Sequence, residues 1–84
     1  NYEQALQDII NIIENDTIDT IAKIKLAIAY LNMNMPDSAI TITNDILKSN
    51  KHNYVAHDVN GLALMKQKKY REAIQSFSDA LSVH

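Results

Sequence analysis

Apolar residues recur at helical spacing along most of the chain. In the clearest run, large aliphatic side chains follow one another at steps of three and four residues: Ile21, Ile24, Ile28 and Leu31. A second stripe runs beside it and consists of Ala22, Leu26 and Ala29. An α-helix brings such positions onto one side, so the pattern predicts helices. Together with similar runs elsewhere, it places them over about 2–14, 20–32, 36–49, 54–67 and 70–82.

Turn-forming residues are scarce, which also favours helices. The 84 residues include one Gly and one Pro, whereas a β-rich fold needs many turns. The proline, Pro36, is followed by Asp37, and both residue types suit the first turn of a helix. With 46% apolar and 21% charged residues, the composition is that of a globular chain. We therefore predict an all-α fold.

A constant interval of 34 residues relates three parts of the chain. Ala5, Ala39 and Ala73 are equally spaced, and the alignment extends to their neighbours without insertion or deletion. Further sets at the same interval are Leu6, Ile40 and Ile74; Ile13, Leu47 and Leu81; and Tyr2, Pro36 and Tyr70. The intervening segments add three pairs: Ala22 and Ala56, Ala27 and Gly61, and Ala29 and Ala63. We expect the repeated alanines to lie where two helices approach closely, because a larger side chain would overpack such a contact.

The interval and the residues on it resemble the tetratricopeptide-repeat family, whose 34-residue unit is a helix–turn–helix. The last unit, counted from Tyr54, carries most of the family's signature: Gly61, Tyr70, Ala73, Phe77, Ala80 and Leu81. The middle unit keeps Leu26, Ala27, Tyr30, Ala39 and Leu47. The chain departs from the family pattern at Thr43, Lys51, His57 and Asn60.

The resemblance implies a tetratricopeptide-type α-solenoid, in which about five helices form antiparallel hairpins in a right-handed superhelical stack. It implies one domain over residues 1–84, with three parts: 1–19, the second helix of a truncated unit, and the full units 20–53 and 54–84. Apolar residues of the first part should cover the next helix pair, namely Leu6, Ile9 and Ile13.

The same resemblance points to a binding surface. In this family the first helix of each unit lines the concave side of the stack. The corresponding positions here are Ile21, Ile24, Lys25, Ile28, Leu31, Asn32, Val55, Asp58, Val59, Leu62, Met65 and Lys66. Eight of these twelve are large aliphatic residues, and a soluble monomer rarely leaves such a patch uncovered. We expect a partner segment to cover it, or alternatively a second copy or further chain.

Residues that carry catalysis or bind metals are few. The chain has no Cys and three histidines, His52, His57 and His84, and none of these forms a metal-ligand motif with a second ligand one helical turn away. We find no acid pair, Gly-rich phosphate loop or Ser/His/Asp set that would support catalysis. The sequence thus predicts a protein that is not an enzyme, with no catalytic residue, cofactor or metal.

Charge and hydropathy argue against two classes of partner, nucleic acids and the interior of a membrane. The net charge is −2, and the only basic cluster is Lys66, Lys68, Lys69 and Arg71, so we expect no nucleic-acid partner. An RNA-binding helical array would need a more basic, polar groove. No apolar run approaches ~18 residues, so we expect no membrane span in this segment. The first residue is Asn1 rather than Met, and we expect the natural N-terminus to lie upstream.

The sequence therefore predicts a scaffold for protein–protein interaction that binds a protein or peptide through the concave groove. Some family members hold a partner's terminal carboxylate there, but Ile24, Ile28 and Val59 stand where such a clamp needs polar groups. The alternative is a structural self-association module, a homodimer through the apolar concave face, within a larger and possibly membrane-anchored protein. Nothing in the sequence assigns a compartment.

Overall fold

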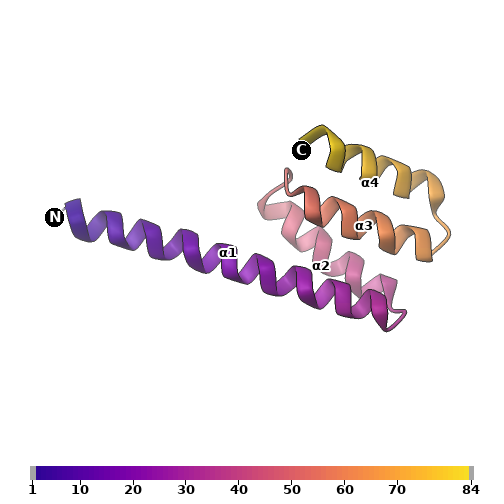
Figure 1. Cartoon of the computed structure of the whole chain (residues 1–84), viewed down its shortest axis with the longest axis horizontal. Coiled ribbons are helices and arrows are strands. Elements are labelled where there is room, and N and C mark those ends of the chain that lie inside the picture. The colour runs from indigo at the N-terminus through magenta and orange to yellow at the C-terminus, as the bar shows by residue number, and fades with distance from the viewer. Residues whose placement is uncertain (1, 84) are drawn as a thin grey trace.

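The computed structural model describes residues 2–83, except for the side chains of Ile13 and Val83. It contains four α-helices: α1 (Tyr2–Asn32), α2 (Pro36–Ser49), α3 (Tyr54–Lys66) and α4 (Tyr70–Val83) (Figure 1). The described residues form no β-strand, which confirms the all-α prediction. The expectations for the Ile13 side chain and for His84 lie outside what the structure describes.

The prediction of separate helices over 2–14 and 20–32 is wrong, because α1 runs unbroken through residues 15–19 and makes the total four rather than five. This stretch has no Gly or Pro, and its polar residues have only modestly weaker helix propensity than alanine. The Thr20 hydroxyl also donates a hydrogen bond to the Asp16 carbonyl oxygen at 2.9 Å, within the helix. Nothing therefore forces a turn.

Consecutive helices run antiparallel and pack in chain order (Figure 1). Each of α2, α3 and α4 packs on the helix before it, and α1 also contacts α3. The main core cluster joins α1, α2 and α3 through small and aliphatic side chains: Ala27, Leu31, Ala39, Val59 and Ala63. The Cα positions span 54 × 27 × 16 Å, so the helices form a thin layer.

Only the second half of α1 takes part in this layer. Residues 2–19, which we call the arm, project beyond the other helices (Figure 1). Leu6 is 59% exposed and Ile9 is 53% exposed, so the expectation that they cover the next helix pair is wrong. Ala5 is exposed as well, whereas its equivalents Ala39 and Ala73 are buried at close helix contacts.

The crossing of α3 over α4 depends on a glycine. A Cβ atom built on Gly61 would lie 2.7–2.9 Å from three ring atoms of Phe77, which is closer than carbon atoms pack. The absence of a side chain at Gly61 thus lets the Phe77 ring lie directly against the α3 backbone.

The α1–α2 and α3–α4 turns repeat in their backbone the 34-residue interval found in the sequence. Asn34 and Lys68 are the two described non-glycine residues with positive φ, at 59° and 64°. Each turn is closed by an amide that donates to a carbonyl five residues earlier: Met35 to Tyr30 at 2.8 Å, and Lys69 to Leu64 at 2.9 Å. Both turns therefore end their helix with the same left-handed motif.

Thr43, Asn60 and Ser76 form a polar contact across three helices. The Asn60 amide nitrogen donates to the Ser76 hydroxyl at 3.1 Å, which links α3 to α4. The Thr43 hydroxyl lies 3.1 Å from the Asn60 side-chain oxygen and 3.0 Å from the Ile40 carbonyl oxygen, and its proton goes to one of the two. Thr43 and Ser76 are buried, and these bonds satisfy polar groups that would otherwise destabilise the core.

Candidate partner-binding groove

A groove of about 410 Å³ runs between α3 and the second half of α1. Seven residues line it: Ile28, Leu31, Asn32, Val59, Leu62, Met65 and Lys66. All seven belong to the twelve concave positions predicted from the sequence. The structure thus brings the C-terminal parts of two equivalent helices together in one apolar hollow.

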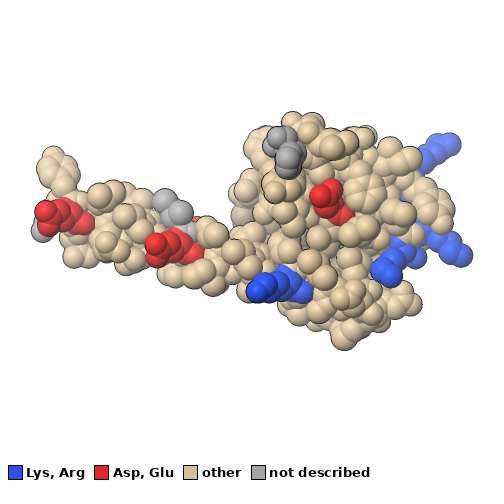
Figure 2. Space-filling model, viewed as in Figure 1, with Lys and Arg blue, Asp and Glu red and all other residues tan. Residues whose placement is uncertain are grey.

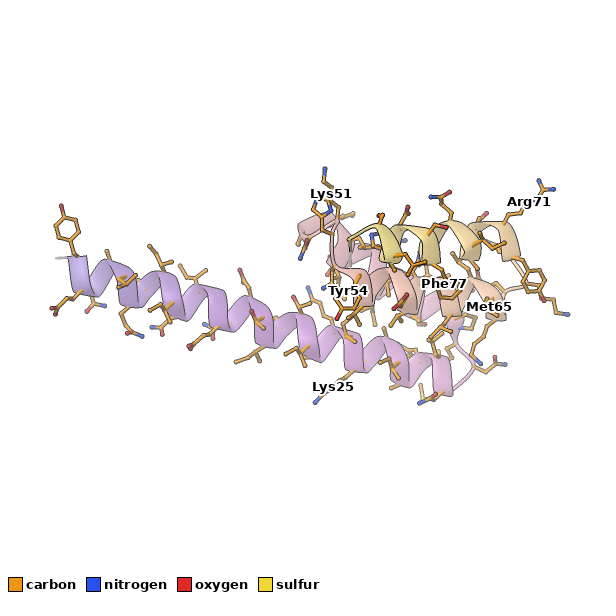
Figure 3. The ribbon with its side chains drawn as sticks, turned by 45° about the horizontal axis from the view of Figure 1, so that its top comes forward. Lys25, Lys51, Tyr54, Met65, Arg71 and Phe77 are labelled. Atoms are coloured by element: carbon orange, nitrogen blue, oxygen red, sulfur yellow. The ribbon has the colours of Figure 1, made fainter. Side chains whose placement is uncertain are left out.

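The groove has a buried floor and half-open walls. Leu31 and Val59 are buried and form the floor, while Ile28 remains 42% exposed and Leu62 remains 47% exposed. Ile28 and Leu62 are separated by the same interval as the repeated alanines, so they face the groove from equivalent positions of α1 and α3. Figure 3 places Met65 at the C-terminal end of α3, where it extends the apolar wall. This surface is available to another apolar side chain.

The other five predicted residues do not line this groove. Val55 and Ile24 are half-buried within the helix layer, and Asp58 is exposed on α3. Lys25 lies on the side of α1 that is turned away from α2–α4 (Figure 3). Ile21 instead lines a second hollow.

This second hollow, of about 430 Å³, lies where the arm leaves the helix layer. It is lined by Asp16, Thr17, Thr20, Ile21, Ser49, Asn50 and Asn53. Sequence reasoning missed it because the repeat predicts a turn over residues 15–19. The available signal was the absence of Gly and Pro before residue 36, which allows one long helix.

Charge is unevenly distributed around the groove. Lys66 is the one ionisable residue that lines it. Lysine and arginine side chains gather at the end of the molecule opposite the arm, whereas the arm carries acidic side chains (Figure 2). The electrostatic environment therefore favours an apolar segment with acidic rather than basic flanks.

One exposed ion pair ties α1 to α2 beside the core. Lys23 Nζ donates to Asp45 Oδ2 at 2.8 Å. The hydrogen bond and the charge of Lys23 lower the pKa of Asp45, and those of Asp45 raise the pKa of Lys23. Because both side chains are solvated, the pair orients the helices without contributing much stability.

Metal clusters and membrane spans are absent from the part of the chain that the structure describes. Among these residues, no group of three or more His, Asp or Glu side chains stands close enough to hold a metal ion. Between residues 2 and 83, no helix is both long and apolar enough to cross a membrane. The His57 ring nitrogen Nε2 lies 2.8 Å from the Lys51 carbonyl oxygen, which gives this side chain a structural contact.

Compared with protein-family models, curated proteins and solved structures, the chain matches none of them. The interpretation of the groove thus depends on its geometry and on the repeat interval.

Proposed function

We propose that this chain is part of a tetratricopeptide-type, right-handed α-solenoid whose role is binding rather than catalysis. Packing in chain order and two turns of the same geometry at the repeat interval support the solenoid. A stack of such units presents a long surface and few enclosed pockets, which favours interaction with another macromolecule.

The ligand is an apolar segment of a protein, held in the groove between α1 and α3. One observation carries this proposal: seven of the predicted concave residues line one hollow, and its walls leave Ile28, Leu62 and Met65 about half exposed. Their burial by a partner removes apolar surface from water, which is the main driving force for such association.

Peptide selection tests the groove before any partner is identified. Peptides of about 15 residues, long enough for one helix, are selected against the chain and measured again against the double variant Ile28→Ser/Leu62→Ser. We expect the dissociation constant to rise about 10- to 100-fold, since two partly exposed aliphatic side chains are lost from the contact. Circular dichroism verifies that the variant keeps its helix content.

The matched control is Ile74→Ser/Leu81→Ser on α4. These two side chains are apolar and at least as exposed as Ile28 and Leu62, but they do not line the groove. Peptides that bind the control and lose the groove variant support the proposal. Peptides that bind both variants equally, or no selected peptide at all, would contradict it.

A further inference from the structure

The arm leaves the aliphatic side chains that the structure describes in it exposed to solvent. It covers residues 2–19, and its exposed aliphatic side chains include Leu6, Ile9, Ile10, Ile12 and Ile18. An isolated helix of this length is marginal in water, and β-branched isoleucines lower helix propensity further. Because α1 is a single straight helix here, the arm does not fold back onto its own helix layer.

An apolar stripe on the arm is continuous with the groove. Counted back from Ile28, Leu6 lies about six full turns of helix away and Ile10 about five. All three therefore lie on the same side of α1, and Ile21 falls between them at 50% exposure. The same face of one helix thus forms a wall of the groove at one end and an uncovered stripe at the other.

The two halves of α1 have opposite charge. The arm contains five acidic residues and no Lys or Arg: Glu3, Asp8, Glu14, Asp16 and Asp19. Residues 20–32 contain Lys23 and Lys25 and no acid, and Lys66 of α3 lines the groove. Two arms side by side would repel each other, whereas an arm placed antiparallel on another chain's groove brings carboxylates toward Lys66, the lysine that lines the groove.

The exposed surface of the chain is large enough for a stable protein–protein interface. The chain exposes 6141 Å², whereas a compact protein of 9.5 kDa is expected to expose about 5,000 Å². The excess of about 1,100 Å² exceeds the roughly 800 Å² that each partner buries in a stable interface of standard size. The arm, about 27 Å long, also spans the whole of α3, which is about 20 Å long.

We infer that the occupant of the groove is the arm of a second copy of this chain, exchanged reciprocally in a two-fold antiparallel dimer. Leu6 and Ile10 of each copy pack against Ile28 and Leu62 of the other. This inference rests on the proposed function, since it names the partner of the same groove. It also explains why the arm remains helical, because packing in the dimer buries its apolar side.

Sedimentation velocity on the 84-residue chain tests the dimer, over concentrations from about 1 to 200 μM. The wild-type chain should shift from monomer to twice its mass of 9.5 kDa. Leu6→Ser/Ile10→Ser in the arm and Ile28→Ser/Leu62→Ser in the groove should each raise the dissociation constant about 100-fold. The matched control Ile12→Ser/Ile18→Ser changes isoleucines that are off the stripe and at least as exposed as Leu6 and Ile10, and it should leave the dissociation constant within a few-fold of the wild-type value.

Mixing the two defective variants identifies the exchange of arms. The arm variant keeps an intact groove and the groove variant keeps an intact arm, so the mixture should form a heterodimer with one productive contact. Restored association in the mixture supports the inference. A dimer that survives the arm variant and disappears only with the groove variant overturns it in favour of direct groove-to-groove pairing.

A chain that stays monomeric at all concentrations also overturns the inference. The proposed function is tested separately by the selected peptides. The arm variant should still bind them, because their binding needs only the groove. If the groove variant loses helix content, Met65→Ser replaces it, because Met65 is a half-exposed wall residue outside the core cluster.

Discussion

At the scale of single residues, backbone conformation is decided at positions that side-chain pattern alone does not mark. Asn34 and Lys68 both adopt the left-handed conformation, yet only asparagine tolerates it readily. In the sequence, Lys68 is one member of a basic cluster. The structure gives it a second role as the residue that ends α3, which no count of charges reveals.

Replacing Lys68 by glycine should stabilise the fold. The left-handed conformation costs an L-residue about 1–2 kcal/mol, which glycine avoids. Glycine in turn destabilises the fold by about 0.5–1 kcal/mol, because its unfolded chain has more conformational entropy to lose. We expect Lys68→Gly to gain roughly 0.5–1 kcal/mol, or about 3–6 °C in thermal midpoint. Asn34→Gly is the matched comparison and should gain less than half as much. Equal gains would show that both turns are equally strained.

Gly61 should not accept even a methyl group. Overpacking against the Phe77 ring costs about 1–3 kcal/mol, and the better helix propensity of alanine returns about 1 kcal/mol. We expect Gly61→Ala to lower the free energy of unfolding by up to about 2 kcal/mol in denaturant titrations. In a Phe77→Leu background the same change should cost much less. A similar cost in both backgrounds would place the clash elsewhere.

At the scale of elements, the positions of α2, α3 and α4 follow from the sequence to within a residue or so, while α1 does not. Pro36 and Asp37 start α2, and the Asn53 side chain caps α3 by accepting from the Ala56 amide at 3.0 Å. The repeat requires a turn over residues 15–19. Local interactions have no such requirement, since these residues continue a helix with only a modest loss of helix propensity.

The groove too follows only in part from the sequence. The repeat predicts that Ile28 and Leu62 share one surface, and both line the groove, because they occupy equivalent positions of α1 and α3. It could not show that Ile24 and Val55 would be half-buried, since that depends on the distance between α1 and α3. Nor could it show that Ile21 would line another hollow, because this required the direction of the arm.

Removing residues 2–16 should leave the thermal midpoint almost unchanged at concentrations where the chain is monomeric. Their apolar side chains that the structure describes are exposed, so little packing is lost. We expect a shift of at most about 3 °C by calorimetry, since exposed positions contribute little. The helix content per chain should fall with the arm. A large drop in the midpoint would mean that the arm folds back onto the layer in solution.

The ion pair between α1 and α2 makes a pH-dependent contribution. The pKa of Asp45 is lowered in the folded state, so its contribution is present above the usual value of 3.8 and is lost as the pH falls through the folded value. Wild type should therefore melt slightly above Asp45→Asn at neutral pH, and the two should converge in acid, below the lowered pKa of Asp45. A difference that persists in acid would assign the effect of Asp45 to something other than its charge.

At the scale of the whole molecule, the arrangement of the helices in one thin layer has a consequence for how the chain folds. In the part of the chain that the structure describes, each contact between helices joins elements that are next or next but one along the chain, so contacting residues are close in sequence. Chains with such local contacts close short loops and fold in microseconds to milliseconds. They also open from their ends: among the described residues α4 contacts no helix but α3, so it can detach while the earlier helices remain paired. Amide hydrogen exchange should accordingly be fast in α4 and the arm, and slowest where α2 and α3 meet.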